Sequence, residues 1–332
     1  MIKFLTFAVK TQINVHDLNN ETGAGNVTDI RIMEFLDEAG NRIEAPAVSG
    51  RMLKHWHQEG IRQLILKNTS TSLRLCDGCK AGEPIRPGEF KNDKLVQVGK
   101  PEDKAIQECV ICDIHGYLIA QEAKSETSEA QPESKEGTKT KKKGISQRRN
   151  SRAMFSWLMP VLGYPTAQRQ VIHTRVSQQG AMAEGEVSAQ MIFNKSYASG
   201  IYAFVSAIDV ERIGLVESNL GLVDPYAVDD HNERKERIKI AIESYRLLLS
   251  GQMGASLSHS IPHQNPIEIL VAYSDKGPLP FPVSPMYSDW LKKTIGLMPE
   301  GTHFVYFGPE APDIALKKYT IEELFQEIIS KV

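Results

Sequence analysis

The sequence predicts an α+β fold with a ferredoxin-like core that long insertions interrupt. Short apolar strands and amphipathic helices follow one another in the order β-α…β-β-α-β along the 332 residues. A hydrophobic fraction of 41% and a charged fraction of 24% are ordinary for a globular chain with a sizeable core. We expect a single cytoplasmic domain over residues 1–332. No apolar run approaches the roughly 20 residues that a membrane helix needs, and the first residues do not resemble a signal peptide.

The first elements are two strands and a helix. Residues 1–16 and 30–35 have the pattern of strands, and the Gly- and Asn-rich residues 18–26 between them predict a loop. A turn at 38–41 precedes residues 43–48, which we expect to lead into a helix. Ser49 is the expected N-cap of this helix. Its apolar side contains Met52, Leu53, Trp56, Ile61 and Leu64.

The middle of the chain departs from this regularity. Residues 69–120 show no clear periodicity, so we expect an irregular region with few core residues. Residues 121–152 contain almost no aliphatic side chain and predict a disordered polar loop, because such a segment cannot bury enough apolar surface to offset its ordering entropy. The loop is acidic in its first half and strongly basic from Lys139 to Arg152.

The second half of the chain again alternates strands and helices. Residues 170–176 and 189–193 predict a hairpin, and residues 200–210 a core strand in which Tyr202 and Phe204 share one face, most simply for core packing. A long helix is expected from a cap at Asp230 to Gly251, and strands at 267–273 and 303–307. Thr320 and Glu323 form the capping box of a C-terminal helix.

Four cysteines give the most specific local signal. Cys76-x2-Cys79 and Cys109-x2-Cys112 each place two thiolates on one side of a tight turn, so together they supply tetrahedral sulfur coordination for a structural Zn²⁺. The 29 residues between the pairs exceed the usual spacing of a zinc ribbon. Four free cysteines or a redox pair are the alternatives. A zinc ion would staple residues 69–120.

Several segments together resemble the backbone subunit of CRISPR type I-A (Cascade) effector complexes, in the DevR branch of the RAMP superfamily. They are, in order, INVHDLNNETGAGN at 13–26, APAVSGRMLKHWHQEG at 45–60, CDIHGYL at 112–118, RVSQQGAMAEGEVSAQMIFNKSYASGIYAFVSAIDVERIG at 175–214, and DDHNERKERIKIAIESYRLLLSGQMGASLSHSIP at 229–262. They cover over a third of the chain. The cysteine quartet departs from the pattern of this family.

The resemblance implies an RNA-binding protein without enzymatic activity, which serves antiviral defence. It implies an RRM-like palm and a thumb hairpin, here residues 168–195, whose copies polymerise along CRISPR RNA and present the guide for pairing with target DNA. Its expected partners are CRISPR RNA, target DNA through the guide, copies of itself and other Cascade subunits. A guide-processing endoribonuclease of the same superfamily and a stand-alone RNA-binding regulator are the alternatives.

A helix N-terminus is the first predicted RNA contact. Its free N–H groups and positive dipole end favour phosphate, and Arg51, Lys54 and His55 lie one turn apart on one face. The predicted contacts here are Ser49, Gly50, Arg51, Lys54 and His55. An ordinary capped helix with a solvated basic face is the alternative.

The resemblance extends the predicted RNA contacts to three further segments. They are the loop with His16, Asn19, Asn20, Gly25 and Asn26; the thumb with Arg175 and an apolar tip residue, Met182, that could wedge between bases; and the small polar segment with Gly254, Ser258 and His259. An ordinary strand connection, a surface hairpin without a partner and a helix C-cap are the respective alternatives.

Two remaining patterns are less specific. The basic run from Lys139 to Arg152 is a solvated linker or a non-specific contact with DNA. The endoribonuclease alternative would need a general base with a partner close by. By residue type its candidates are His16, His55, His57 and His115, but they form no recognisable catalytic signature.

Overall fold

A nine-stranded sheet forms the centre of the protein in a computed structural model that describes residues 1–18, 27–120, 146–176, 190–228, 231–254 and 263–332. Its middle strand is β1 (Phe4–Asn14), which pairs antiparallel with β12 (Gln190–Asp209) on one side and β13 (Asn265–Ser274) on the other. Beyond β13 lie β14 (His303–Phe307), antiparallel, and β15 (Ala315–Lys318), parallel to β14. The strands β2 (Val27–Thr28), β9 (Ala153–Phe155), β10 (Met159–Pro160) and β11 (Ala167–Val176) pair with β12.

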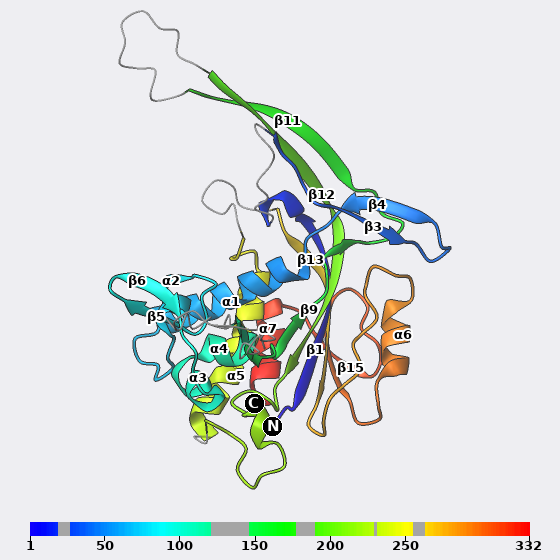
Figure 1. Ribbon diagram of the computed structural model, residues 1–332. Helices are drawn as coiled ribbons and strands as arrows, with labels where there is room; N and C mark the ends of the chain where they lie inside the picture. The colour runs from blue at the N-terminus through cyan, green and yellow to red at the C-terminus, as the bar shows by residue number, and fades with distance from the viewer. Residues whose placement is uncertain (19–26, 121–145, 177–189, 229–230, 255–262) are drawn as a thin grey trace, which may run out of the picture.

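Helices cover both faces of this sheet unequally. On one face lie α1 (Gly50–Lys67), α5 (His231–Leu249) and α7 (Ile321–Ile329), and on the other lies α6 (Trp290–Leu297) (Figure 1). Phe7 from β1 stacks on Tyr245 from α5, with ring centroids 4.3 Å apart. The described residues also contain two short 3-10 helices, Val15–Asp17 and Glu217–Asn219. No helix in the described ranges is long and apolar enough to span a bilayer.

Local signals in the sequence place the ends of these helices. The hydroxyl of Ser49 accepts a hydrogen bond from the Met52 amide at 3.3 Å, and that of Thr320 accepts one from the Glu323 amide at 3.0 Å, so both predicted caps are confirmed. Gly251 follows α5 with a φ of +73°. The cap expected at Asp230 lies outside the described residues.

Glycines allow α1 to pack closely on its neighbours. A Cβ at Gly60 would lie 2.3 Å from the Ser244 hydroxyl of α5. A Cβ at Gly50 would lie 2.5 Å from the carbonyl oxygen of Phe155 in β9. These distances are too short for any side chain, so both positions require glycine.

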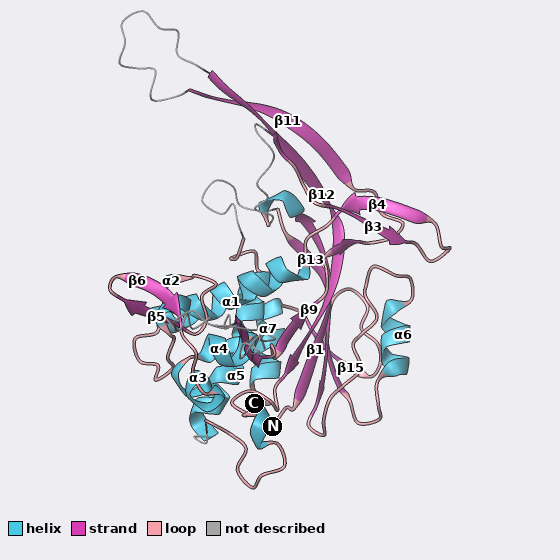
Figure 2. Cartoon of the chain, viewed as in Figure 1, coloured by secondary structure: helices cyan, strands magenta, loops and turns pink. Residues whose placement is uncertain are grey.

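A long hairpin extends from the body of the protein (Figures 1 and 2). It consists of β11 and the first half of β12, paired from Ala167 with Ser199 to Val176 with Gln190. The predicted hairpin is therefore confirmed. We expected separate strands at 189–193 and 200–210, but β12 is one strand of 20 residues that passes from the hairpin into the central sheet. Its Tyr202 and Phe204 are buried, as core packing required.

A second hairpin was missed in the sequence. It pairs β3 (Ile32–Leu36) with β4 (Arg42–Pro46) around the predicted turn, in which the Asn41 amide donates to the Asp37 carboxylate at 2.7 Å. Residues 43–48 lead into α1 as expected, but most of them form β4, which was not predicted from the sequence. The alternation of Arg42, Ile43 and Glu44 agrees with a strand that exposes one face.

The region expected to be irregular contains regular structure. We call residues 69–120 and 146–149 the cysteine region; they form α2 (Asp77–Ala81), β5 (Gly88–Lys91), β6 (Lys94–Gln97), α3 (Glu102–Glu108), α4 (Val110–His115), β7 (Tyr117–Ala120) and β8 (Ser146–Arg149). Val110, Ile111 and Ile114 are fully buried and join the main core. The expectation of few core residues is therefore wrong.

The end of the polar loop also requires a correction. Residues 146–152 are ordered: β8 pairs antiparallel with β7, and Arg149 and Arg152 are only 3% and 1% exposed. Both arginines form internal ion pairs. Arg149 pairs with Glu102 and Asp113, and Arg152 pairs with Glu217. They therefore belong to neither a solvated linker nor a DNA-contacting run. The rest of the predicted loop, 121–145, lies outside the described residues.

Candidate nucleic-acid interface and metal centre

The four cysteines meet in one cluster. All four sulfur atoms lie within 4.8 Å of one another, and the Cys76 and Cys112 sulfurs are 3.8 Å apart. Tetrahedral coordination with metal–sulfur bonds of about 2.3 Å places sulfur ligands about 3.8 Å apart, which is the separation of the Cys76 and Cys112 sulfurs. The cysteines are unbridged, and three of them are buried. These four residues could therefore hold a metal ion.

Backbone groups support the cluster. The Cys112 amide points at the Cys109 sulfur at 3.4 Å, and the Gly88 amide points at the Cys76 sulfur at 3.5 Å. Hydrogen bonds from Cys109, Cys112 and Cys79 lower the pKa of the Cys76 thiol, whereas hydrogen bonds within the same cluster raise the pKa of the Cys79 and Cys112 thiols. All four thiols must lose their protons when a metal ion binds. Each pair of cysteines spans the start of a short helix, α2 or α4, where we expected only a tight turn.

A buried ionic cluster lies next to these thiols. The Asp113 carboxylate, adjacent to Cys112 in α4, is bound by Arg149 at 2.5 Å and by Arg237 of α5 at 2.9 Å, and it also accepts the Gly214 amide at 3.0 Å. The side chains of all three charged residues are fully buried. The cluster therefore joins the cysteine region to α5 and to the loop after β12. Nothing in the local sequence marked these residues.

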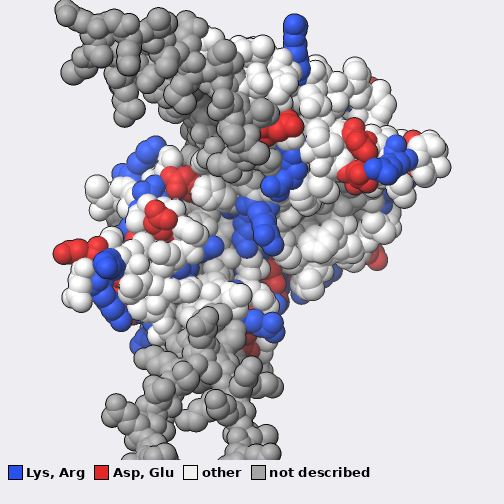
Figure 3. Space-filling view, turned by 45° about the horizontal axis from the view of Figure 1, so that its top comes forward, with Lys and Arg blue, Asp and Glu red and all other residues white. Residues whose placement is uncertain are grey.

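The basic face of α1 lies on the surface, as predicted. Arg51 and His55 are exposed and Lys54 is half-buried. Burial, with a further contribution from the charge of Arg86, lowers the pKa of Lys54 to about 8. Gly50 is buried against β9, so its position serves helix packing. Lys and Arg side chains are spread over the face in Figure 3, with a compact group near its centre, and acidic side chains lie among them.

His16 lies beside the base of the long hairpin. Its ring nitrogen Nδ1 is 3.1 Å from the Ala198 carbonyl oxygen, and its ring contacts that of Tyr197 edge-on at 4.6 Å. The Tyr197 hydroxyl is 2.8 Å from His173 Nε2, on the neighbouring strand. An open hollow of about 580 Å³ here is lined by Asn14, His16, Arg169 and Tyr197, among others. Tyr197, His173 and Arg169 were not singled out in the sequence.

Two of the histidines considered as catalytic candidates form a buried pair. His57 Nε2 donates to the Ala241 carbonyl at 2.8 Å, so His57 Nδ1 must accept from His115 Nε2 at 3.0 Å. Burial lowers the pKa of His57 to about 4, and burial also lowers that of His115. Both rings are therefore neutral near pH 7. Their burial argues against direct contact with an RNA substrate.

Several predicted contacts fall where the structure gives no side chain. The positions outside the described residues are Asn19, Asn20, Gly25, Asn26, Met182, Ser258 and His259. Arg175 lies near the outer end of β11, but only its backbone is described. Gly254 is described and buried, just after α5.

The fold has a counterpart among solved structures. The chain resembles a chain of a solved "CRISPR RNA-guided surveillance complex, pre-nicking", with a TM-score of 0.56, 11% identity and 99% of both chains covered. At this identity the likeness establishes a shared mixed α/β fold.

The family follows from the sequence match. Residues 7–295 match the family model described as "CRISPR-associated negative auto-regulator DevR/Csa2". The chain belongs to this family, and the resemblance expected from its motifs is confirmed.

Relatives match along nearly the whole chain. A "CRISPR-associated protein Cas7/Cst2/DevR" of Methanocaldococcus jannaschii is 28% identical and covers 99% of this chain and 100% of its own length. A protein of the same description from Thermoproteus tenax is 26% identical over 93% of this chain and 91% of its own. A "CRISPR-associated aCascade subunit Cas7/Csa2 2" of Saccharolobus solfataricus is 24% identical over 87% of this chain and 84% of its own.

Proposed function

We propose that the chain is a CRISPR-RNA-binding backbone subunit of a type I Cascade effector complex. Family membership over residues 7–295 carries this proposal, and one relative is described as a subunit of such a complex. Copies of the chain polymerise along the guide RNA, beside other Cascade subunits, and present the guide for pairing with target DNA. The protein holds RNA backbone while base pairing reads the target, as in other RNA-guided systems. Its place is the cytoplasm, where such complexes meet invading DNA.

The central sheet serves as a ferredoxin-like, RRM-like palm. The supporting observation is the interleaving of two βαβ units, β1-α1-β9 and β12-α5-β13. Strand β12 lies between β1 and β9, and β1 lies between β12 and β13, all antiparallel. The β11–β12 hairpin serves as the thumb over residues 168–195, with Arg175 near the end of β11 and Met182 as the residue proposed to wedge between bases.

Guide RNA follows the basic face of α1 and the base of the thumb. Arg51 and Lys54, together with His55 when its ring is protonated, place positive charges one turn apart on an accessible face. His16 and the hollow beside Tyr197 continue this surface toward the thumb. The loop of Asn19, Asn20, Gly25 and Asn26 and the segment with Gly254, Ser258 and His259 complete the proposed contacts.

The metal ion is Zn²⁺ in a structural role. All four ligands would be protein thiolates from Cys76, Cys79, Cys109 and Cys112, so no coordination position remains for a reacting water. Bound there, the ion would hold α2 and α4 together. Metal analysis of the purified chain tests this: we expect about one equivalent of zinc per chain, and its absence would contradict the assignment.

The protein acts without catalysis. The buried, neutral state of His57 and His115 supports this, because a general base must reach the proton that it removes. The endoribonuclease and regulator alternatives remain distinguishable by experiment.

The decisive experiment examines the nucleic acid that copurifies with the chain at low salt, followed by electron microscopy. RNA of discrete length in a helical assembly of many copies is the expected result. A monomer that cleaves added repeat RNA would establish the endoribonuclease, and a monomer bound to RNA of mixed lengths would indicate the regulator.

A pair of double variants tests the α1 face. Arg51→Ala with Lys54→Ala weakens RNA binding and leaves the fold intact, whereas Lys91→Ala with Lys94→Ala removes two exposed cations from the β5–β6 hairpin without this effect. Equal binding by both double variants would contradict the site on α1.

A further inference from the structure

Arg86 reaches α1 from the cysteine region. It lies between α2 and β5, and its Nη1 donates to Gln58 Oε1 of α1 at 2.7 Å. Gln58 lies four residues after Lys54, so the two side chains are neighbours on one helix face. Arg86 therefore extends the row of cations that begins with Arg51 and Lys54.

No carboxylate of the described residues neutralises this pair of cations. Among the residues that the structure describes, Lys54 forms no hydrogen bond or ion pair, and the buried Nε of Arg86 has no partner. The nearest acid along α1, Glu59, accepts hydrogen bonds from Arg62 at 2.8 Å and from Gln63 at 3.2 Å. Glu59 therefore pairs with Arg62 and Gln63 and not with Lys54 or Arg86.

Holding two cations together without a counter-charge costs free energy. The depressed pKa of Lys54, caused first by burial and then by the charge of Arg86, reports this cost. An anion placed between the two groups would remove the repulsion and satisfy the unpaired guanidinium nitrogen. Arg and Lys together suit a phosphate, because the guanidinium offers parallel donors and the ammonium a compact charge.

We propose that Lys54 and Arg86 jointly bind one phosphate group of the guide RNA backbone. This inference rests on the proposed RNA-binding function and deepens it, because the cysteine region then supplies half of a site that begins on the palm. The chain around Arg86 is anchored accordingly. Gln97 Nε2 donates to the Arg86 carbonyl at 2.6 Å, and the Gly88 amide, two residues on, points at the Cys76 sulfur at 3.5 Å.

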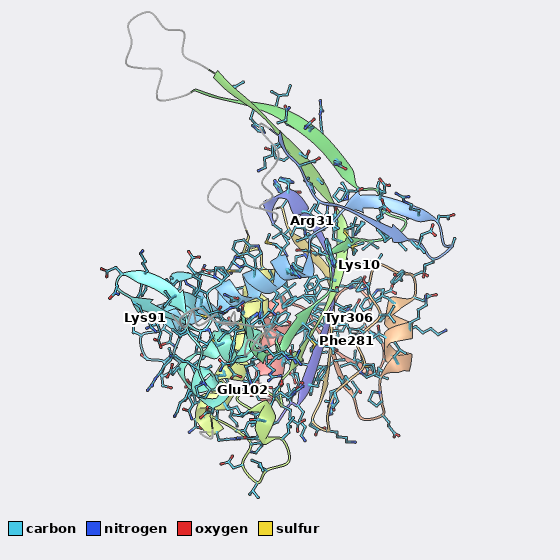
Figure 4. The ribbon with its side chains drawn as sticks, viewed as in Figure 1. Lys10, Arg31, Lys91, Glu102, Phe281 and Tyr306 are labelled. Atoms are coloured by element: carbon cyan, nitrogen blue, oxygen red, sulfur yellow. The ribbon has the colours of Figure 1, made fainter. Side chains whose placement is uncertain are left out.

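The test measures the binding of a fluorescent single-stranded RNA oligonucleotide to the full chain over a range of salt concentrations. Arg86→Gln should weaken binding about tenfold, as expected for one charge-assisted contact. It should also reduce the slope of log affinity against log salt by roughly 0.7. Lys91→Gln, an exposed cation at the outer end of the same region (Figure 4), should change neither quantity.

A second pair of variants separates charge from structure. Arg86→Lys keeps the charge and should restore the salt slope, whereas Gln58→Met removes the hydrogen bond to Arg86 and should leave the slope unchanged. If Arg86→Gln disturbs the fold, Lys54→Gln on α1 applies the same slope test to the other half of the site.

Each outcome decides the question. A wild-type slope in Arg86→Gln overturns the shared phosphate site but leaves the RNA-binding function standing. Failure of the wild-type chain to bind the oligonucleotide at any salt concentration overturns both.

Discussion

The sheet with its helices and the cysteine region are held together by different chemistry. Between β1, α5 and α7, contacts are largely apolar and aromatic: Phe7 stacks on Tyr245 at 4.3 Å and lies near Phe325 at 6.2 Å. In the cysteine region, a cluster of four thiols and the triad of Asp113, Arg149 and Arg237 lie among the apolar side chains.

The difference predicts how each region fails. Apolar burial is distributed over many contacts, so the loss of one is partly absorbed by the others. A thiolate cluster or a buried charge depends on every partner, because removal of one leaves the rest desolvated and uncompensated. The cysteine region should therefore respond more sharply to single substitutions and to metal removal.

The largest effect is expected from loss of a cysteine ligand. Cys109→Ser should abolish metal binding and release the amides of α2 and α4 to hydrogen exchange while those of β1 stay protected. Structural zinc contributes on the order of 10 kcal/mol of binding free energy in small zinc domains, so the local loss should be large. Hydrogen exchange read by mass spectrometry measures it.

Val110→Ala is the matched control for this experiment. It removes a buried neighbour of Cys109 that is no ligand, and it should keep the metal content unchanged. Unaltered exchange of α4 in Cys109→Ser would show that the thiols do not hold this region.

An intermediate effect is expected at the ionic triad. Asp113→Asn leaves Arg149 and Arg237 buried without their shared counter-charge, and should lower the free energy of unfolding by about 3–5 kcal/mol. Urea denaturation measures the change. Glu34→Gln, which breaks an exposed pair with Arg42, should cost no more than about 1 kcal/mol. Similar costs for the two variants would show that burial does not distinguish them.

The third effect develops gradually with pH: it is a dependence of stability on pH where the two regions meet. His57 of α1 has a pKa of about 4 in the folded chain, below the ordinary value of 6.5, because it is buried against His115 of α4. Below pH 6.5, His57 binds a proton in the unfolded chain but stays neutral in the folded chain until the pH approaches 4. The stabilisation present above pH 6.5 is therefore lost as the pH falls toward 4, by about 1.4 kcal/mol per pH unit for His57.

Urea denaturation between pH 7.5 and pH 4.5 tests this dependence. The lowered pKa of His115 acts in the same direction and steepens the loss. His57→Asn should flatten the profile, and His303→Asn, an exposed histidine on β14, should not. A wild-type free energy of unfolding that stays constant over this range would contradict the buried neutral pair.

The sequence by itself determined the local elements and the family. Caps at Ser49 and Thr320, the strands β1, β13 and β14 and the two Cys-x2-Cys turns depend on residues a few positions apart, so the sequence pattern predicts them without the fold. The sequence did not predict that β12 is one continuous strand, because polar residues such as Asn194 and Ser196 interrupt the apolar pattern where the strand leaves the core.

Only the tertiary structure decided which distant residues meet. It brought together two cysteine pairs that have 29 residues between them, and it joined Arg86 by a hydrogen bond to Gln58, one helical turn from Lys54. It also buried Arg149 and Arg152, which look like part of a solvated basic run because composition reports the average preference of a segment. An arginine is buried only when acids such as Asp113 and Glu217 come to it from elsewhere in the chain, and that encounter is a property of the folded chain alone.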